Sequence, residues 1–163
     1  MGTADTIKSG SVEDLFEQVS EMEAHVIAVH AENVDETLAH FSRLCRITGR
    51  SIYHWDEAEG LKSLKETEIS VPGSRRLTEA LRYVLQSMHY GVYVLTGYER
   101  QLRQPSINLL RQIARIRTGY DRKVVLLGTK VSLPSGLNDV AKHVVHQRIN
   151  REKPKLRDGR WVF

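Results

Sequence analysis

The residues best suited to chemistry are polar side chains that end or follow short apolar runs. His30 closes one such run, Asp56 follows a second, and Glu99 follows a third. Runs of this kind predict buried strands, and ligands of open α/β sheets bind at the carboxyl ends of the strands. Arg100 and Arg103 lie just behind Glu99, and guanidinium groups bind phosphate well. These five residues are therefore the candidate ligand-binding residues.

The segment after the first apolar run lacks the features of a phosphate loop. Residues 30–36 read His-Ala-Glu-Asn-Val-Asp-Glu, with three acids and neither glycine nor lysine. A phosphate loop uses glycines to bring backbone N–H groups close to the phosphate, and a lysine to supply charge. No GxxxxGK[ST] or GxGxxG motif occurs in the chain. The sequence therefore predicts no cofactor and no phosphoryl transfer of the P-loop kind.

A cluster of acids offers a second route to enzymatic activity. Asp56, Glu57 and Glu59 follow one predicted strand closely, and carboxylate oxygens are the ligands that Mg²⁺ prefers. We favour the interpretation that this is an acidic, solvated loop. A metal enzyme that uses Asp56, Glu59 and Glu99 is the alternative that the sequence leaves open.

The histidines and the single cysteine match no catalytic or metal-binding motif. Neither HExxH nor GxSxG occurs. His30 and His54 both fall near strand ends and are expected to be neighbours, whereas His143 and His146 should face opposite sides of one strand. Cys45 lies on an apolar helix stripe, which predicts a small buried hydrophobe. We expect no catalytic residue and no metal site, and the pattern favours a protein without enzymatic activity.

The net charge of +4 resides in the C-terminal segment. Residues 148–163 hold six basic and two acidic residues, and the other 147 residues hold 18 of each sign. Such a segment can bind an acidic protein surface, a nucleic acid or anionic lipid, or simply remain solvated. The candidate partner-binding residues are Arg151, Lys153, Lys155, Arg157, Arg160, Trp161 and Phe163.

Length and composition indicate one globular domain. The chain has 163 residues, of which 40% are hydrophobic and 27% charged. We expect a flexible leader over 1–10, an α/β domain over 11–147 and a basic tail over 148–163, in which Asp158-Gly159 predicts a hairpin turn. No apolar run is long enough for a membrane helix or a signal peptide, and a single cysteine suits a reducing compartment. A cytoplasmic location is therefore expected.

Apolar periodicity predicts strands that alternate with helices. The expected strands are 25–30, 51–55, 91–95, 123–128 and 143–145, and the expected helices are 11–22, 33–48, 74–88 and 105–119. A polar loop is expected over 56–73, with a short strand near Ile69–Val71 as an alternative within it, and a turn or short helix is expected over 133–137. Asn33 is the expected N-cap of the second helix, and Gly49 its stop. The pattern predicts a three-layer α/β sandwich with a mostly parallel sheet of about five strands.

Four stretches, residues 26–37, 49–61, 92–102 and 123–137, resemble in their order the N-terminal region of certain bacterial AAA-type ATPases. In that family a degenerate domain without a phosphate loop precedes the ATPase module. The resemblance implies a P-loop-NTPase-like or Rossmann-like sandwich. In it, residues 92–99 correspond to the Walker B strand and residues 123–129 to the sensor strand. It also implies that the chain stops where the ATPase module would begin, and that the fold is retained for contacts.

A nucleotide-enzyme fold without its phosphate loop predicts a non-catalytic protein-interaction or regulatory module. Such a module would dock on a larger ATPase or a membrane-associated machine, or assemble with itself. One alternative is a receptor that holds a nucleotide or cyclic nucleotide through Arg100, Arg103 and the basic tail. The others are a nucleic-acid-binding protein that acts through the tail and the metal enzyme described above.

Overall fold

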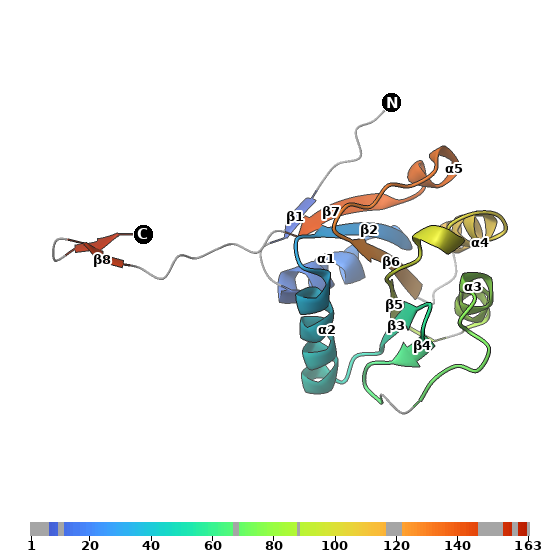
Figure 1. Cartoon of the computed structure of the whole chain (residues 1–163), viewed down its shortest axis with the longest axis horizontal. Helices are drawn as coiled ribbons and strands as arrows, with labels where there is room; N and C mark the ends of the chain where they lie inside the picture. The colour runs from blue at the N-terminus through green and yellow to red at the C-terminus, as the bar shows by residue number, and fades with distance from the viewer. Residues whose placement is uncertain are drawn as a thin grey trace.

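A mostly parallel sheet of seven strands lies at the centre of the part of the chain that the structure describes (Figure 1). This computed structural model describes residues 7–9, 12–66, 69–87, 89–116, 122–146, 155–157 and 160–162. The strands are β1 (Ile7–Ser9), β2 (Val26–Ala31), β3 (Ile52–Asp56), β4 (Gly60–Ser63), β5 (Gly91–Leu95), β6 (Arg122–Gly128) and β7 (Lys142–His146). Their order is β1-β7-β2-β6-β5-β3-β4, and every neighbouring pair is parallel except β3 and β4. The predicted mostly parallel α/β sheet is confirmed.

Helices cover both faces of the sheet (Figure 1). They are α1 (Val12–Glu21), α2 (Val34–Thr48), α3 (Leu77–Gln86), α4 (Ser106–Ala114) and α5 (Ser135–Asn138), with a 3-10 turn, η1, at Glu99–Gln101. One core contains Phe16 of α1 and Phe41 of α2, and the other contains residues of α3, α4 and α5. The arrangement is the three-layer sandwich that the sequence predicts.

Strand β2 shows why the strands read as continuous apolar runs. Val26 and Ala28 point into the core beneath α3 and α4, whereas Ile27 and Val29 point into the core beneath α1 and α2. All four are fully buried. Because each face of the sheet is covered, successive residues on a central strand must all be apolar.

Strand β4 corrects the loop that the sequence predicts over residues 56–73. It pairs antiparallel with β3, and Lys62 also forms an isolated bridge with Ser70. Gly60 starts the strand at φ 75°, and a Cβ there would lie 2.7 Å from Ser74 Oγ. The same Ser74 hydroxyl accepts a hydrogen bond of 2.8 Å from the Leu61 N–H. The strand depends on these distant partners, which a short half-polar stretch does not reveal.

Several other elements begin or end away from the expected residues. Strand β1 lies inside the expected leader over 1–10 and pairs with β7. Helix α3 begins three residues after the expected start at Ser74, and α4 ends at Ala114. Ser11 and Gly119, the expected ends of two helices, lie outside the described residues.

Two further strands form a small separate sheet. Strands β8 (Lys155–Arg157) and β9 (Arg160–Val162) pair antiparallel. They flank Asp158-Gly159, the dipeptide at which the sequence predicts a hairpin turn.

Candidate functional site

The carboxyl edge of the sheet contains a topological switch point between β2 and β6. These strands are parallel neighbours, with His30 opposite Gly128. The chain leaves β2 into α2 on one face and leaves β6 into α5 on the other face. Ligands of open α/β sheets bind where neighbouring connections diverge in this way. A nucleotide, if one bound, would be expected here.

The connection from β2 to α2 does not form an anion site. Only two residues, Glu32 and Asn33, separate the strand from the helix. Asn33 Oδ1 accepts a hydrogen bond of 3.0 Å from the Glu36 N–H, so the side chain of the helix cap satisfies a donor that a phosphate would need. Asp35 and Glu36 occupy the first turn of α2, where the helix dipole favours acids. The expected cap is confirmed, and its acids would repel phosphate.

Beneath α5, two histidines form a directed chain of hydrogen bonds. The Val131 N–H donates to His30 Nδ1 at 3.1 Å, so this nitrogen must be an acceptor and Nε2 carries the proton. His30 Nε2–H then donates to His143 Nδ1 at 3.0 Å, and His143 Nε2–H donates to Asn138 Oδ1 at 2.7 Å. The two rings also stack, with centroids 5.3 Å apart. One backbone donor thus sets the tautomer of both neutral rings.

Burial favours the neutral form of these histidines. Desolvation lowers the pKa of His30 below 6.5, and the neighbouring His143 lowers it further. Desolvation also lowers the pKa of His143. A second proton on His30 would displace the Val131 N–H, and one on His143 Nδ1 would oppose the His30 donor. The chain of hydrogen bonds therefore requires both rings to be uncharged.

The expected pairing of His30 with His54 is wrong, because β6 and β5 lie between their strands. His54 instead lies 2.7 Å, through Nε2, from Thr96 Oγ1, and burial lowers its pKa. The prediction that His146 and His143 face opposite sides of the sheet is confirmed. His146 lies near His40 of α2, and burial, together with the charge of His40, lowers the pKa of His146.

Gln101 joins three segments farther along the same edge. Its Oε1 accepts a hydrogen bond of 2.6 Å from the N–H of Leu77, the first residue of α3. Its Nε2 donates to Glu57 Oε1 at 3.1 Å and to the Arg75 carbonyl at 3.4 Å. A side chain of η1 thus satisfies the start of α3, where no side chain of the helix itself provides a cap. Gln101 is not among the residues predicted from the sequence, since no local pattern signals so distant a contact.

A comparison with known protein families identifies the family to which this chain belongs. The model described as "SpoVK-like AAA ATPase, N-terminal domain" matches residues 13–146. The chain belongs to this family. The suspected relation to AAA-type ATPases is thereby confirmed, and membership indicates a role within a larger AAA machine, in contact with other proteins. No curated protein and no solved structure matches the chain.

The acids of this SpoVK-like domain are engaged in local contacts. Asp56 Oδ1 accepts a hydrogen bond of 2.7 Å from the Glu59 N–H, which closes the turn between β3 and β4. Glu59 pairs with Lys62, and Glu57 accepts from Gln101. Within the described residues, no group of three or more histidines, cysteines or acids could hold a metal ion. These contacts hold the acids within the β3–β4 turn and against η1.

The five candidate ligand-binding residues divide into separate groups. His30 lies in the chain of hydrogen bonds beneath α5, and Asp56 lies in the β3–β4 turn. Glu99, Arg100 and Arg103 are exposed at and after η1. The Gln101–Glu57 hydrogen bond brings η1 beside the β3–β4 turn, whereas His30 lies in a separate set of contacts. The part of these five residues in ligand binding stays a prediction.

The tail residues lie outside what the structure describes in atomic detail. Arg151, Lys153 and Phe163 fall outside the described residues, and only the backbone of Lys155, Arg157, Arg160 and Trp161 is described, within β8 and β9. Their proposed part in partner binding stays a prediction.

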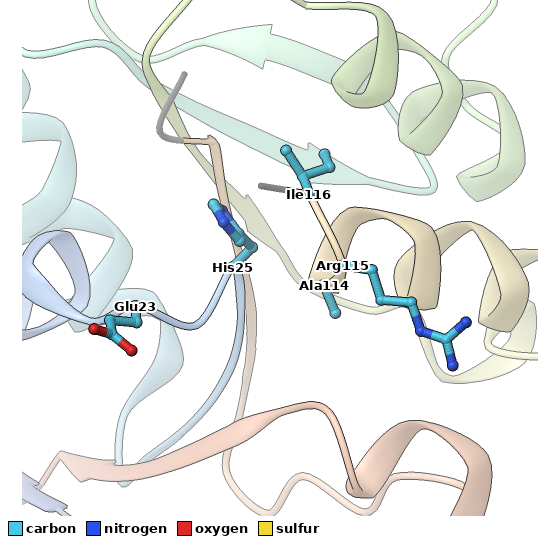
Figure 2. A pocket seen from close by; sticks show the side chains of 5 residues that line it. All are labelled: Glu23, His25, Ala114, Arg115 and Ile116. Carbon is cyan, nitrogen blue, oxygen red and sulfur yellow. The ribbon is translucent and has the colours of Figure 1, made fainter. Parts of the chain in front are cut away.

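A pocket of about 660 Å³ lies at the opposite, amino edge of the sheet. Figure 2 shows the side chains that line it. The pocket is lined by Glu23, His25, Ala114, Arg115 and Ile116. His25 Nδ1 lies 2.8 Å from the Arg122 carbonyl, so this ring is already used to hold β6 beside the start of β2.

Cys45 is fully buried, as expected, and its thiol donates a hydrogen bond to the Arg50 carbonyl. In the part of the chain described here, no helix has the length and apolar character needed to cross a membrane.

Proposed function

We propose that this domain is a docking module of an AAA machine and that it works without binding or hydrolysing nucleotide. The observation that carries the proposal is the closed switch point between β2 and β6. A connection of two residues stands where a phosphate loop would be, and the Asn33 side chain occupies one N–H donor of the first turn of α2. The His30–His143 chain joins β2 and β7 to the connection between β6 and α5. When a protein's own side chains fill the place where related folds bind a ligand, the fold can still serve as a scaffold whose surface binds other proteins.

The first test is a panel of Mg-ATP, Mg-ADP, Mg-GTP and cyclic dinucleotides against the purified chain, read by thermal unfolding and calorimetry. A ligand at 100 times its dissociation constant stabilises the folded state by about 2.7 kcal/mol. For a domain of this size that raises the melting temperature by about 5–10 °C. We expect no shift and no saturable heat. A reproducible shift with saturable binding would overturn the proposal.

The second test measures docking itself. The chain is immobilised and presented with an AAA-type ATPase module of the same organism, in the presence of Mg-ATP, Mg-ADP or no nucleotide. We expect capture whose strength does not depend on nucleotide added to the domain beforehand. Failure of the module to bind in any nucleotide state contradicts a docking role on that ATPase.

The nucleotide receptor remains the second candidate, because one observation favours it. Arg100 and Arg103 are exposed, and within the described residues neither guanidinium is in an ion pair. If the panel gave a shift, Arg100→Ala/Arg103→Ala should remove it. Persistence of the shift in that variant would exclude these arginines as the phosphate ligands.

A further inference from the structure

The charges of the folded domain are sorted by helical layer. Residues 12–48, which carry α1 and α2, contain eight acidic and two basic residues, a net charge of −6. Residues 75–116, which carry α3, η1 and α4, contain seven basic and two acidic residues, a net charge of +5. These layers lie on opposite faces of the sheet (Figure 1). The zero net charge of the body of the chain therefore conceals one acidic face and one basic face.

Four arginines at one end of the basic layer form what we call the arginine surface: Arg75, Arg76, Arg100 and Arg103. All four are exposed, and within the described residues none of their guanidinium groups is in an ion pair. The ion pairs of the described residues lie elsewhere, as in Arg82–Glu79 on α3. The arginine surface thus keeps its capacity for bidentate bonds to carboxylates.

The backbone that carries the arginine surface is held in place by Gln101. Its side chain bonds the Arg75 carbonyl and the Leu77 N–H, and its own carbonyl accepts from the Arg103 N–H at 2.9 Å. Two segments that are 25 residues apart in sequence are therefore tied together with their arginines directed outward. A fixed frame lowers the entropy that these side chains lose on binding.

The acidic layer offers the complementary groups. Glu17 and Glu21 lie one turn apart on α1, are exposed, and have no ion pair within the described residues. They lie on the side of α1 opposite Leu15, Phe16 and Val19, which are buried in the core. Because α1 and the arginine surface belong to opposite layers of one molecule, neither can neutralise the other within one copy.

We propose that the arginine surface of one copy of this chain docks on the acidic α1–α2 layer of another. The inference rests on the proposed docking function and names its partner as a second copy. The contact is heterologous, since it joins two different patches. A docked pair still presents one free arginine surface and one free acidic layer, so association can continue beyond a dimer. Oppositely charged patches also raise the rate at which two copies associate, and their attraction weakens as the salt concentration rises.

The first experiment compares two charge reversals of equal size by sedimentation velocity of the full chain. Wild type should self-associate at about 50 mM salt and dissociate at about 500 mM, where charges a few ångströms apart are screened. Arg100→Glu/Arg103→Glu should abolish association. Arg43→Glu/Arg46→Glu, in exposed positions on the acidic layer, makes the same change in net charge and should preserve or strengthen association. Circular dichroism checks that each variant folds.

The second experiment tests which patches meet. Glu17→Ala/Glu21→Ala keeps the arginine surface but loses two acids of α1, and Arg100→Ala/Arg103→Ala does the reverse. Each should be monomeric alone. The Glu17→Ala/Glu21→Ala protein supplies arginines, and its partner supplies acids, so an equimolar mixture should form a one-to-one heterodimer whose remaining patches carry no complementary charge and which does not grow.

The results that overturn the inference are specific. A wild-type chain that stays monomeric at low salt excludes a second copy as the partner. Association that survives Arg100→Glu/Arg103→Glu places the contact elsewhere, and the absence of a heterodimer in the mixture excludes this pairing of patches. None of these results bears on the nucleotide panel, which decides the proposed function separately.

Discussion

Two regions of the carboxyl edge, the switch point and the surroundings of η1, use polar groups in opposite ways. At the switch point, the polar atoms of His30 and His143 are bonded to one another and to their neighbours, and both rings are partly buried. Around η1, only Gln101 is used internally, and the arginines beside it remain exposed without ion pairs within the described residues. In the function that we propose, closure at the switch point removes a ligand site, whereas restraint around η1 prepares a docking surface. The difference predicts that substitutions at the switch point cost stability and those around η1 cost association.

The largest loss of stability is expected from His30→Ala. The substitution leaves the Val131 N–H and His143 Nδ1 without the partners described above, and a partly buried polar group without a partner costs about 1–3 kcal/mol. We expect the free energy of unfolding to fall by about 2 kcal/mol and the melting temperature by about 4–8 °C. Urea unfolding at pH 7.5 measures the change. The exposed His89→Ala is the control, and equal stability of both variants would contradict the assigned chain.

A smaller loss is expected from Gln101→Ala. The variant leaves the Leu77 N–H at the start of α3 without its side-chain acceptor, and loss of such a cap costs about 1 kcal/mol. It also releases Glu57 and the Arg75 carbonyl. Thermal unfolding should show a decrease of about 2–4 °C, with the exposed Gln112→Ala as matched control. A Gln101→Ala protein as stable as that control would show that the clamp contributes little.

The pH dependence of stability tests the His30–His143 pair in the wild-type chain, before any side chain is removed. A lowered pKa in the folded state means that the unfolded chain binds protons more readily between the folded value and 6.5. The contribution of His30 and His143 to the free energy of unfolding is therefore fully present above pH 6.5 and is lost as the pH falls below that value. The urea midpoint should fall between pH 7.5 and 5.5, and His30→Ala/His143→Ala should make the fall shallower. His54 and His146 also have lowered pKa values, so part of the fall should persist; an unchanged slope would contradict the argument.

Local patterns predicted the central strands and the cap of α2, because those features depend on neighbouring residues. The apolar run that becomes β6 and the Asn33 cap with its following acids can be read within a few positions. The order of the strands in the sheet cannot be predicted from neighbouring residues in this way. The sequence placed His30 beside His54, yet β7 and β6 are the strands that lie beside β2, and His30 contacts His143 of β7. The partner of a strand-end residue depends on the whole topology, which residue types alone do not specify.

The same limit explains the missed surface. Net charge counted along the chain placed the whole excess in residues 148–163 and gave zero for the rest. Only the assignment of α1 and α2 to one face, and of α3 and α4 to the other, separates that zero into acidic and basic layers. Arg100 and Arg103 were selected as phosphate ligands, but Arg75 and Arg76 join them only because Gln101 connects η1 to the start of α3.

The smallest effect on stability, and the sharpest test of the comparison, is expected from Arg100→Ala/Arg103→Ala. Exposed arginines without ion pairs contribute little to folding, so the free energy of unfolding should change by less than about 0.5 kcal/mol. The same variant should lose self-association at low salt, because two of the four guanidinium groups of the arginine surface are gone. Thermal unfolding and sedimentation on one preparation measure both quantities. A large loss of stability would show that these arginines support the fold, and the distinction between a closed end and a prepared surface would then fail.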